Sequence, residues 1–304
     1  MNNLNIVASD DFSASPASAR GMKAVNLTRA KTCSVMGNVV YAERNGKKLR
    51  LQIVKPTQQD PAEKLPLIVF VQGSAWHKQN KYTNIPQLSR FALRGYVVAF
   101  VEYRESDIAP FPAQAQDCKT AIRFMKAHVD DYGVDAENVF LWGDSSGGHT
   151  VMMAGITGDS APDTADYGEF SCKVNAIVNY YGPVDLAKMC EQPSTMNHGL
   201  PDSPEGYLIG KLSVLEHPDK VRAANPVAYI FADKECPPVL TMHGDTDRLV
   251  PFEQSVIIHK ALIAAGKYSE YYKLLGADHG TGEFWSEGAY DIVEAFIRKF
   301  RNDL

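Results

Sequence analysis

The sequence predicts a single α/β domain, built as a mostly parallel, doubly wound sheet with helices on both faces. Three observations lead to this prediction. Short apolar runs alternate along the chain with segments of helical periodicity. The apolar runs are continuous, as expected for strands that are covered on both faces. The 304 residues contain no internal repeat and no linker that would separate two domains.

The N-terminal part is expected to differ from the rest. Residues 1–35 are predicted to form a flexible arm, because the stretch from Ser13 to Arg20 consists of small residues and a proline. The α/β domain is then expected over residues 36–304. It should open with a β-hairpin, since apolar and polar residues alternate on both sides of the turn at Asn45-Gly46.

After the hairpin the expected order is strand, loop and helix, repeated. One stretch, residues 183–236, is rich in Pro, Asp and Lys and breaks this alternation, and we expect it to form a small cap over a site. The expected strands cover residues 67–71, 96–103, 138–143, 175–182, 237–244 and 270–276. The expected helices cover residues 85–94, 112–129, 146–157, 252–265 and 287–300.

Composition and charge exclude several classes of protein. The chain has 45% hydrophobic and 22% charged residues, which is typical of a globular protein and not of a disordered or fibrous one. The net charge is −5, with no basic stripe, so neither a nucleic acid nor an anionic membrane is expected as a partner. The longest apolar runs are the length of strands, far below the roughly 18 residues of a membrane span.

Cofactors, metals and disulfides are not expected either. The five cysteines are widely spaced and form no C-x-x-C pair. The sequence contains no G-x-G-x-x-G, no G-x-x-x-x-G-K-[ST] and no H-E-x-x-H, which excludes the usual nucleotide and zinc-protease motifs. The first residues lack the basic and apolar parts of a secretory signal, so a reduced, cytoplasmic setting is expected. The alternative is a secreted protein from which a signal peptide was removed. No motif indicates an oligomeric state.

The main chemical signal is a serine between two glycines. Gly143, Ser145 and Gly147 fit G-x-S-x-G, with an expected buried strand before the motif and an expected helix after it. A turn tight enough to project a serine from this junction brings the residues two positions away into close contact, where a side chain does not fit. Ser145 satisfies this requirement, whereas the neighbouring Ser146 has Asp144 at the crowded position. Ser145 is therefore the predicted nucleophile.

A nucleophilic serine needs a base, and the base needs an acid that orients it. In doubly wound folds with this elbow, the chain order is nucleophile, acid, histidine. His279 follows the expected strand 270–276 directly, and it is the predicted base. The acid should follow strand 237–244, where location alone leaves Asp245 and Asp247 equally eligible.

The same chemistry needs two N–H donors for the oxyanion that forms on the substrate. One is expected from the backbone of Ser146, the residue after the nucleophile. The other is expected from the loop after strand 67–71, which is residues 72–76, and within it from the backbone of Ser74.

These motifs together resemble the α/β-hydrolase superfamily. More narrowly, the chain is similar to bacterial carboxylesterases that include feruloyl-esterase-like and acetyl-ester-cleaving enzymes, which are related to the hormone-sensitive-lipase group. The likeness spans about residues 67–300, and its acid-loop pattern H-G-x-x-D-x-x-V-P implies Asp247 as the acid. One departure is that the family usually has H-G-G-G-W where this chain has QGSAW. The matching segments are GDSSGGH, YYGPVDL, HGDTDRLVPFEQS and LLGADHG.

The resemblance implies a serine carboxylesterase that acts through an acyl-enzyme intermediate on a small-molecule or polysaccharide-linked ester. The acyl group is expected to be short or aromatic (acetyl or hydroxycinnamoyl, the latter as in plant polysaccharides). An interfacial lipase is not expected, because residues 183–236 are polar. Trp76, Tyr181 and Trp285 are candidate substrate contacts, since aromatic rings next to the site can stack on an aromatic acyl group. The alternatives are a small serine peptidase on the same fold and a catalytically silent binding protein.

Overall fold

The computed structural model describes residues 14–57 and 63–302, and the chain falls into two units, Met1–Ala30 and Lys31–Leu304. In the first unit the described residues, 14–30, form a turn at Arg20-Gly21 and otherwise lack helix and strand. In the second unit the first strand begins at Cys33, three residues before the predicted start of the α/β domain.

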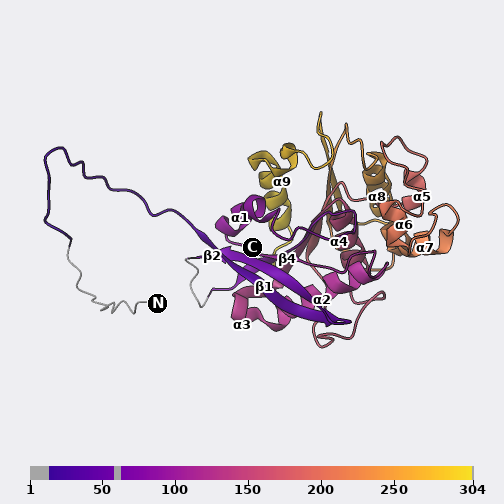
Figure 1. The fold of residues 1–304 in the computed structure, drawn as a ribbon, viewed down its shortest axis with the longest axis horizontal. Coiled ribbons are helices and arrows are strands. Elements are labelled where there is room, and N and C mark those ends of the chain that lie inside the picture. Colours follow the sequence, from indigo (N-terminus) through magenta and orange to yellow (C-terminus); the bar gives the residue numbers. More distant parts are fainter. Residues whose placement is uncertain (1–13, 58–62, 303–304) are drawn as a thin grey trace. The chain divides into compact units, whose positions relative to one another are not determined.

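The second unit is built on one eight-stranded sheet, drawn in Figure 1. Its order is β1-β2-β4-β3-β5-β6-β7-β8. The hairpin of β1 and β2 pairs antiparallel with β4, and the remaining neighbours are parallel, so the predicted doubly wound α/β fold is confirmed. The strands are β1 (Cys33–Arg44), β2 (Lys47–Pro56), β3 (Leu65–Val71), β4 (Val97–Val101), β5 (Val134–Asp144), β6 (Ala176–Tyr180), β7 (Val239–Gly244) and β8 (Ser269–Leu274).

Helices cover both faces of this sheet (Figure 1). Side chains of α1 and α9 pack in one apolar layer, and those of α2, α4 and α8 pack in the other. None of the helices in the described ranges combines the length and the apolar character that crossing a membrane requires. The helices outside the segment 183–236 are α1 (Ile85–Leu93), α2 (Ala113–Ala127), α3 (Val129–Tyr132), α4 (Ser146–Thr157), α8 (Glu253–Ala264), the 3₁₀ helix η2 (Gly282–Trp285) and α9 (Glu287–Arg298).

Strand β3 shows why its sequence is apolar at nearly every position. Leu67 and Val69 face the layer that holds α2, α4 and α8, whereas Ile68 and Phe70 face the layer that holds α1 and α9. Successive side chains of a strand point to opposite faces, so a strand covered on both sides needs an unbroken apolar run. The same reasoning applies to β4 and β5.

Residues 183–236, called the insertion from here on, lie between β6 and β7. Their short helices α5, α6 and α7 gather at one end of the domain (Figure 1). Apolar side chains such as Leu186, Leu208 and Val221 form a third core cluster together with Trp76. The elements of the insertion are α5 (Leu186–Met189), α6 (Pro204–Leu208), α7 (Pro218–Ala223) and the 3₁₀ helix η1 (Pro226–Tyr229).

Candidate active site

Ser145 lies on the sharp turn between β5 and α4. Its backbone has φ +51° and ψ −126°, a conformation that L-residues rarely adopt. The turn is so tight that a Cβ atom at Gly143 would lie 2.3 Å from the carbonyl oxygen of Gly147, and one at Gly147 would lie 2.0 Å from the carbonyl oxygen of Val71. Because both contacts are with backbone, these two positions accept glycine alone. The predicted elbow geometry is present.

Three side chains from three strand ends meet at this turn. His279 Nε2 lies 3.0 Å from Ser145 Oγ, and His279 Nδ1 lies 2.8 Å from Asp247 Oδ2. A carboxylate accepts hydrogen bonds, so the proton of the neutral imidazole resides on Nδ1. Nε2 is then free to accept the hydroxyl hydrogen of Ser145.

Asp247 is held by more groups than His279 alone. Its Oδ1 accepts the backbone N–H groups of Leu249 and Val250, each at 2.9 Å, and its Oδ2 also lies 3.1 Å from His243 Nε2. Burial alone would raise the pKa of the Asp247 carboxyl, but the hydrogen bonds from His243 and His279 hold this pKa well below its usual range. Asp247 therefore stays ionised and fixes the orientation of His279.

The structure separates the two acid candidates that location could not. Asp245 Oδ1 accepts the backbone N–H of Gly276 at 2.7 Å, which joins the loop after β7 to the loop after β8. His243 was not among the sequence-based site residues. It is fully buried, its Nδ1 lies 2.7 Å from Ser255 Oγ, and its Nε2 lies 3.0 Å from the carbonyl oxygen of Val250. Its position near the end of β7, two residues before Asp245 and four before Asp247, is the signal that the sequence offers.

Loop 72–76 is fastened to the elbow by its backbone. The N–H of Gly73 donates to Asp144 Oδ1, and the N–H of Ser74 donates to Ser146 Oγ, both at 2.9 Å. Burial raises the pKa of the Asp144 carboxyl to about 6, although the Gly73 N–H acts in the opposite direction. Ala75 has a φ of +54°, so the loop adopts with an alanine a conformation that favours glycine.

The Ser74 side chain holds the same loop from the other side. Its Oγ donates to the carbonyl oxygen of His77 at 2.7 Å and lies 2.8 Å from the Tyr103 hydroxyl. Burial raises the pKa of Tyr103 to about 12, which keeps that hydroxyl protonated and able to donate. The Ser74 hydroxyl is thus engaged in anchoring the loop.

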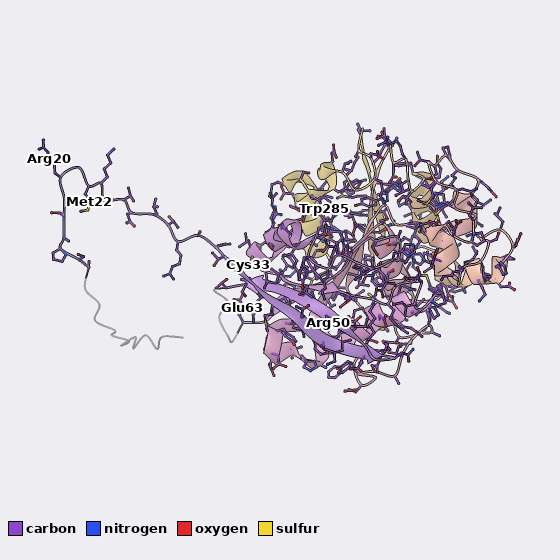
Figure 2. All side chains as sticks on the ribbon, in the orientation of Figure 1. Arg20, Met22, Cys33, Arg50, Glu63 and Trp285 are labelled. Carbon is purple, nitrogen blue, oxygen red and sulfur yellow. The ribbon has the colours of Figure 1, made fainter. Side chains whose placement is uncertain are left out.

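The three candidate aromatic contacts lie in different surroundings. Trp76 is buried and its Nε1 donates to His149 Nδ1 at 3.3 Å. The ring of Tyr181 lies edge-on to the ring of His279, with centroids 4.6 Å apart. Trp285, labelled in Figure 2, stacks at 6.3 Å on Trp142, which is part of the sheet core. The role of these rings as substrate contacts stays a prediction.

His149 connects the helix after Ser145 to the insertion. Its Nε2 donates to the carbonyl oxygen of Ala224 at 2.7 Å, while its Nδ1 accepts from Trp76. Both contacts suit a neutral ring, and burial lowers the pKa of His149 to about 4. His149 therefore has a packing role between α4 and the insertion.

A small pocket opens beside Ser145. Its volume is about 40 Å³, so the pocket is small. Ala75, Ser146, Leu249 and Val250 are among the residues that line it, and residues of the insertion form the opposite wall. The pocket thus joins the elbow, loop 72–76 and the loop that carries Asp247.

Comparison with known sequences gives one matching family and several relatives that are named as esterases. A family model described as BD-FAE matches residues 51–262. Esterase LipC of Mycobacterium tuberculosis is 32% identical over 224 residues, which are 72% of this chain and 54% of that protein. An isoprenylcysteine alpha-carbonyl methylesterase of Arabidopsis thaliana is 26% identical over 81% of this chain and 56% of that protein. The chain spans about half the length of the curated relatives it matches.

Solved structures with the same fold include two esterases. A truncated carbohydrate esterase from gut microbiota has a TM-score of 0.77 and 29% identity, over 89% of this chain and 97% of that one. An esterase of Thermogutta terrifontis, Est2, has a TM-score of 0.71 and 25% identity, over 89% of this chain and 94% of that one.

Proposed function

We propose that this chain, which belongs to the BD-FAE family, is a serine carboxylic ester hydrolase of α/β-hydrolase fold that acts on short-chain acyl esters such as acetates. The observation that carries the proposal is the continuous contact from Ser145 Oγ to His279 Nε2 and from His279 Nδ1 to Asp247 Oδ2. A catalytically silent binding protein would need none of these contacts, so their presence together favours an enzyme.

The proposed reaction proceeds in two halves. His279 takes the hydroxyl proton of Ser145 while the oxygen attacks the ester carbonyl, and Asp247 stabilises the resulting imidazolium. The protonated His279 then gives its proton to the leaving alcohol, which leaves the acyl group on Ser145. Water, activated by His279 in the same way, attacks the acyl-enzyme and releases the carboxylic acid.

The oxyanion is proposed to bind to backbone N–H groups of Ser146 and of loop 72–76, with Ser74 as the contributor. Ser146 begins α4, so its N–H belongs to the helix end that stabilises negative charge. The N–H of Ser74 now donates to the Ser146 hydroxyl and would have to turn from that oxygen to the substrate. Such preorganised donors contribute about 10²–10³ in rate each.

The size of the pocket beside Ser145 supports a short acyl group. At about 40 Å³ it suits an acetyl group better than a long chain. Est2 of Thermogutta terrifontis has been solved with propionate and with butyrate bound, which are short acids as well. Hydroxycinnamoyl esters and polysaccharide-linked esters remain predicted substrates, and the experiment below includes an aromatic ester for this reason.

The proposal is tested with one panel of esters. We expect p-nitrophenyl acetate and butyrate to be hydrolysed, methyl ferulate less efficiently, and p-nitrophenyl palmitate hardly at all. Ser145→Ala should lower kcat by about 10⁴–10⁶-fold, because no other group supplies the nucleophile. The measurement is kcat/KM for each ester at one pH, for the wild type and the variant.

A covalent label provides the control. A fluorophosphonate should modify Ser145 in the wild type, as identified by mass spectrometry of the labelled peptide, while Ser145→Ala stays unlabelled. Ser146→Ala is the matched variant and should still be labelled at Ser145. Labelling at Ser146, or no labelling of a folded protein, would overturn the proposed nucleophile.

A further inference from the structure

The pocket beside Ser145 has an apolar residue of the insertion at its mouth. Met196 lines this pocket, is 37% exposed, and is the most exposed residue of the lining. Within the described ranges its side chain belongs to none of the three apolar core clusters. A residue that both lines a pocket and reaches the surface lies where the pocket opens. Met196 therefore borders the entrance and not the interior of the pocket.

The inner wall of the pocket is fixed by packing and charge. Trp76 and Val250 belong to the third core cluster. His198 and Glu205 form a buried ion pair, with Nδ1 and Oε2 3.1 Å apart and side chains 2% and 4% exposed. Side chains that are packed in this way do not move aside without loss of contacts. A larger group thus finds no additional space at the inner end of the pocket.

The backbone that carries Met196 is fastened to the loop of the proposed acid. The N–H of Thr195 donates to the carbonyl oxygen of Arg248 at 2.8 Å, and Ser194 Oγ donates to the carbonyl oxygen of Leu249 at 2.9 Å. The N–H of Met196 donates to Ser194 Oγ at 3.1 Å. The main chain of Met196 therefore keeps its place beside this loop, whereas its unbranched thioether side chain can adopt several rotamers.

The lining of the pocket indicates which part of the ester it receives. Among the described residues, Ser145 and Ala75 line the pocket but His279 does not. The base that protonates the leaving alcohol has to lie beside that alcohol. A pocket next to the nucleophile and loop 72–76, but away from the base, is therefore on the acyl side.

We propose that Met196 is a specificity-determining residue that closes the outer end of the acyl pocket and limits the enzyme to short acyl chains. This inference rests on the proposed esterase function and assigns its chain-length preference to one side chain. A chain longer than acetyl has to extend from the small pocket toward its mouth, where Met196 lies. A smaller side chain at this position would leave space in which the added methylenes are removed from water. Each methylene that is fully buried contributes about fourfold to an equilibrium or rate constant.

The experiment lengthens the acyl group and the alcohol separately. The acyl ratio is kcat/KM for p-nitrophenyl hexanoate divided by that for p-nitrophenyl acetate, and the alcohol ratio is kcat/KM for hexyl acetate divided by that for methyl acetate. We expect Met196→Ala to raise the acyl ratio by about tenfold or more, because part of the added chain is then buried. The alcohol ratio should stay unchanged, since the alcohol lies on the side of His279. Met196→Leu, which conserves the volume of the side chain, should keep both ratios of the wild type.

A second exposed side chain of the insertion provides the control. Leu200 is 46% exposed and is not part of the pocket lining. Leu200→Ala should therefore leave both ratios unchanged. Each ratio compares two esters on one enzyme preparation, so it does not depend on the fraction of folded enzyme.

The outcomes separate the inference from the proposed function. If Met196→Ala leaves the acyl ratio unchanged while the esters are still cleaved, Met196 does not limit the acyl chain and the inference is wrong, whereas the proposed function stands. A rise in the alcohol ratio instead would place the alcohol in this pocket and would also contradict the inference. An equal rise in Leu200→Ala would point to general loosening of the insertion, with the same consequence. If the wild type cleaves no ester at all, the proposed function fails.

Discussion

At the scale of single residues, the two aspartates after β7 show how a small shift in position changes a role. Asp247 Oδ2 contacts His279, whereas Asp245 Oδ1 receives the N–H of Gly276. In each of these two contacts, one carboxylate oxygen at this end of the sheet accepts a hydrogen bond. The difference is that one contact orients an imidazole and the other joins two loops.

This difference gives a direct prediction. Asp247→Asn should lower kcat by about 10⁴-fold, because an amide no longer favours the proton on His279 Nδ1. Asp245→Asn should lower kcat by less than about threefold, since an asparagine still accepts from Gly276 and a neutral hydrogen bond contributes little. The measurement is kcat with p-nitrophenyl acetate for both variants. A larger loss of kcat in Asp245→Asn than in Asp247→Asn would show that Asp245, and not Asp247, is the acid.

Local sequence rules identify the residues of the candidate triad but not the contacts within the insertion. Ser145 and His279 follow from a motif or a position at a strand end, and the structure brings both within contact of Asp247. By contrast, His198 and Glu205 of the insertion form a buried ion pair, with Nδ1 and Oε2 3.1 Å apart, although no periodicity relates their two positions. Their proximity depends on how the short helices fold back, which is a long-range property that a pattern does not encode.

At the scale of elements, the elbow depends on how closely β3, β5 and α4 approach one another. Gly147 lies in the first turn of α4 and directly against the backbone of Val71 at the end of β3. Gly155 lies two turns later in the same helix, and a Cβ atom there would meet the side-chain end of Ile177 at 2.5 Å. One neighbour is rigid backbone, and the other is a side chain that can change its rotamer.

The two glycines should therefore respond differently to the same change. Gly147→Ala should lower the free energy of unfolding by about 3 kcal/mol or more and abolish activity, because the helix must move away from β3. Gly155→Ala should cost about 1 kcal/mol and leave kcat within about twofold, since Ile177 can adjust. Urea unfolding and ester hydrolysis measure the two effects. Equal losses would mean that the close approach at Gly147 is not what shapes the elbow.

Helices and strands were predicted well where one pattern, helical periodicity or a continuous apolar run, extends along the whole segment. The expected helix 146–157 has the observed bounds of α4, and every expected strand is present with ends shifted by a few residues. The hairpin begins earlier than expected, at Cys33, because β1 continues through an irregularity between Met36 and Val39 where Asn38 has a φ of +61°. The short helices α5 to α7 had no signal of this kind, since each is too short to show a period.

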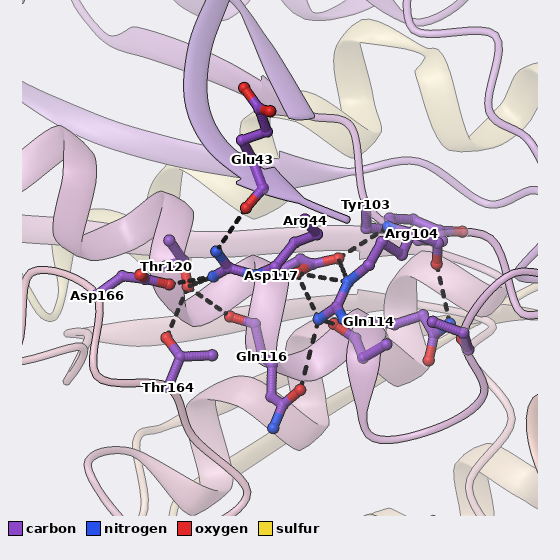
Figure 3. Close-up of polar contacts among 12 residues, drawn as sticks. Glu43, Arg44, Tyr103, Arg104, Gln114, Gln116, Asp117, Thr120, Thr164 and Asp166 are labelled. Atoms are coloured by element: carbon purple, nitrogen blue, oxygen red, sulfur yellow. Dashed lines mark hydrogen bonds and ion pairs between the residues drawn. The ribbon is translucent and has the colours of Figure 1, made fainter. Parts of the chain in front are cut away.

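At the scale of the whole molecule, one buried carboxylate joins parts of the chain that are far apart in sequence. Asp117 of α2 is fully buried and accepts from Arg104 Nε and Nη2, as Figure 3 shows. The backbone N–H of Arg104 also donates to Asp117 at 2.8 Å. Burial raises the pKa of Asp117, and the contacts with Arg104 offset part of that effect. Arg44 of the hairpin lies 4.0 Å from the same carboxylate and pairs with Asp166.

This arrangement connects stability to the site, because Arg104 directly follows Tyr103, whose hydroxyl lies 2.8 Å from Ser74 Oγ in loop 72–76. Asp117→Asn should lower the free energy of unfolding by about 3–5 kcal/mol, since it leaves the Arg104 guanidinium without its anion in a largely buried position. Asp166→Asn is the matched control. It removes a carboxylate from the same cluster, but at a partly exposed position, and should cost less than about 1 kcal/mol. Urea unfolding followed by tryptophan fluorescence distinguishes the two variants. Similar losses in both would mean that the hairpin contact through Arg44, and not the Arg104 pair in the loop after β4, carries the stabilisation.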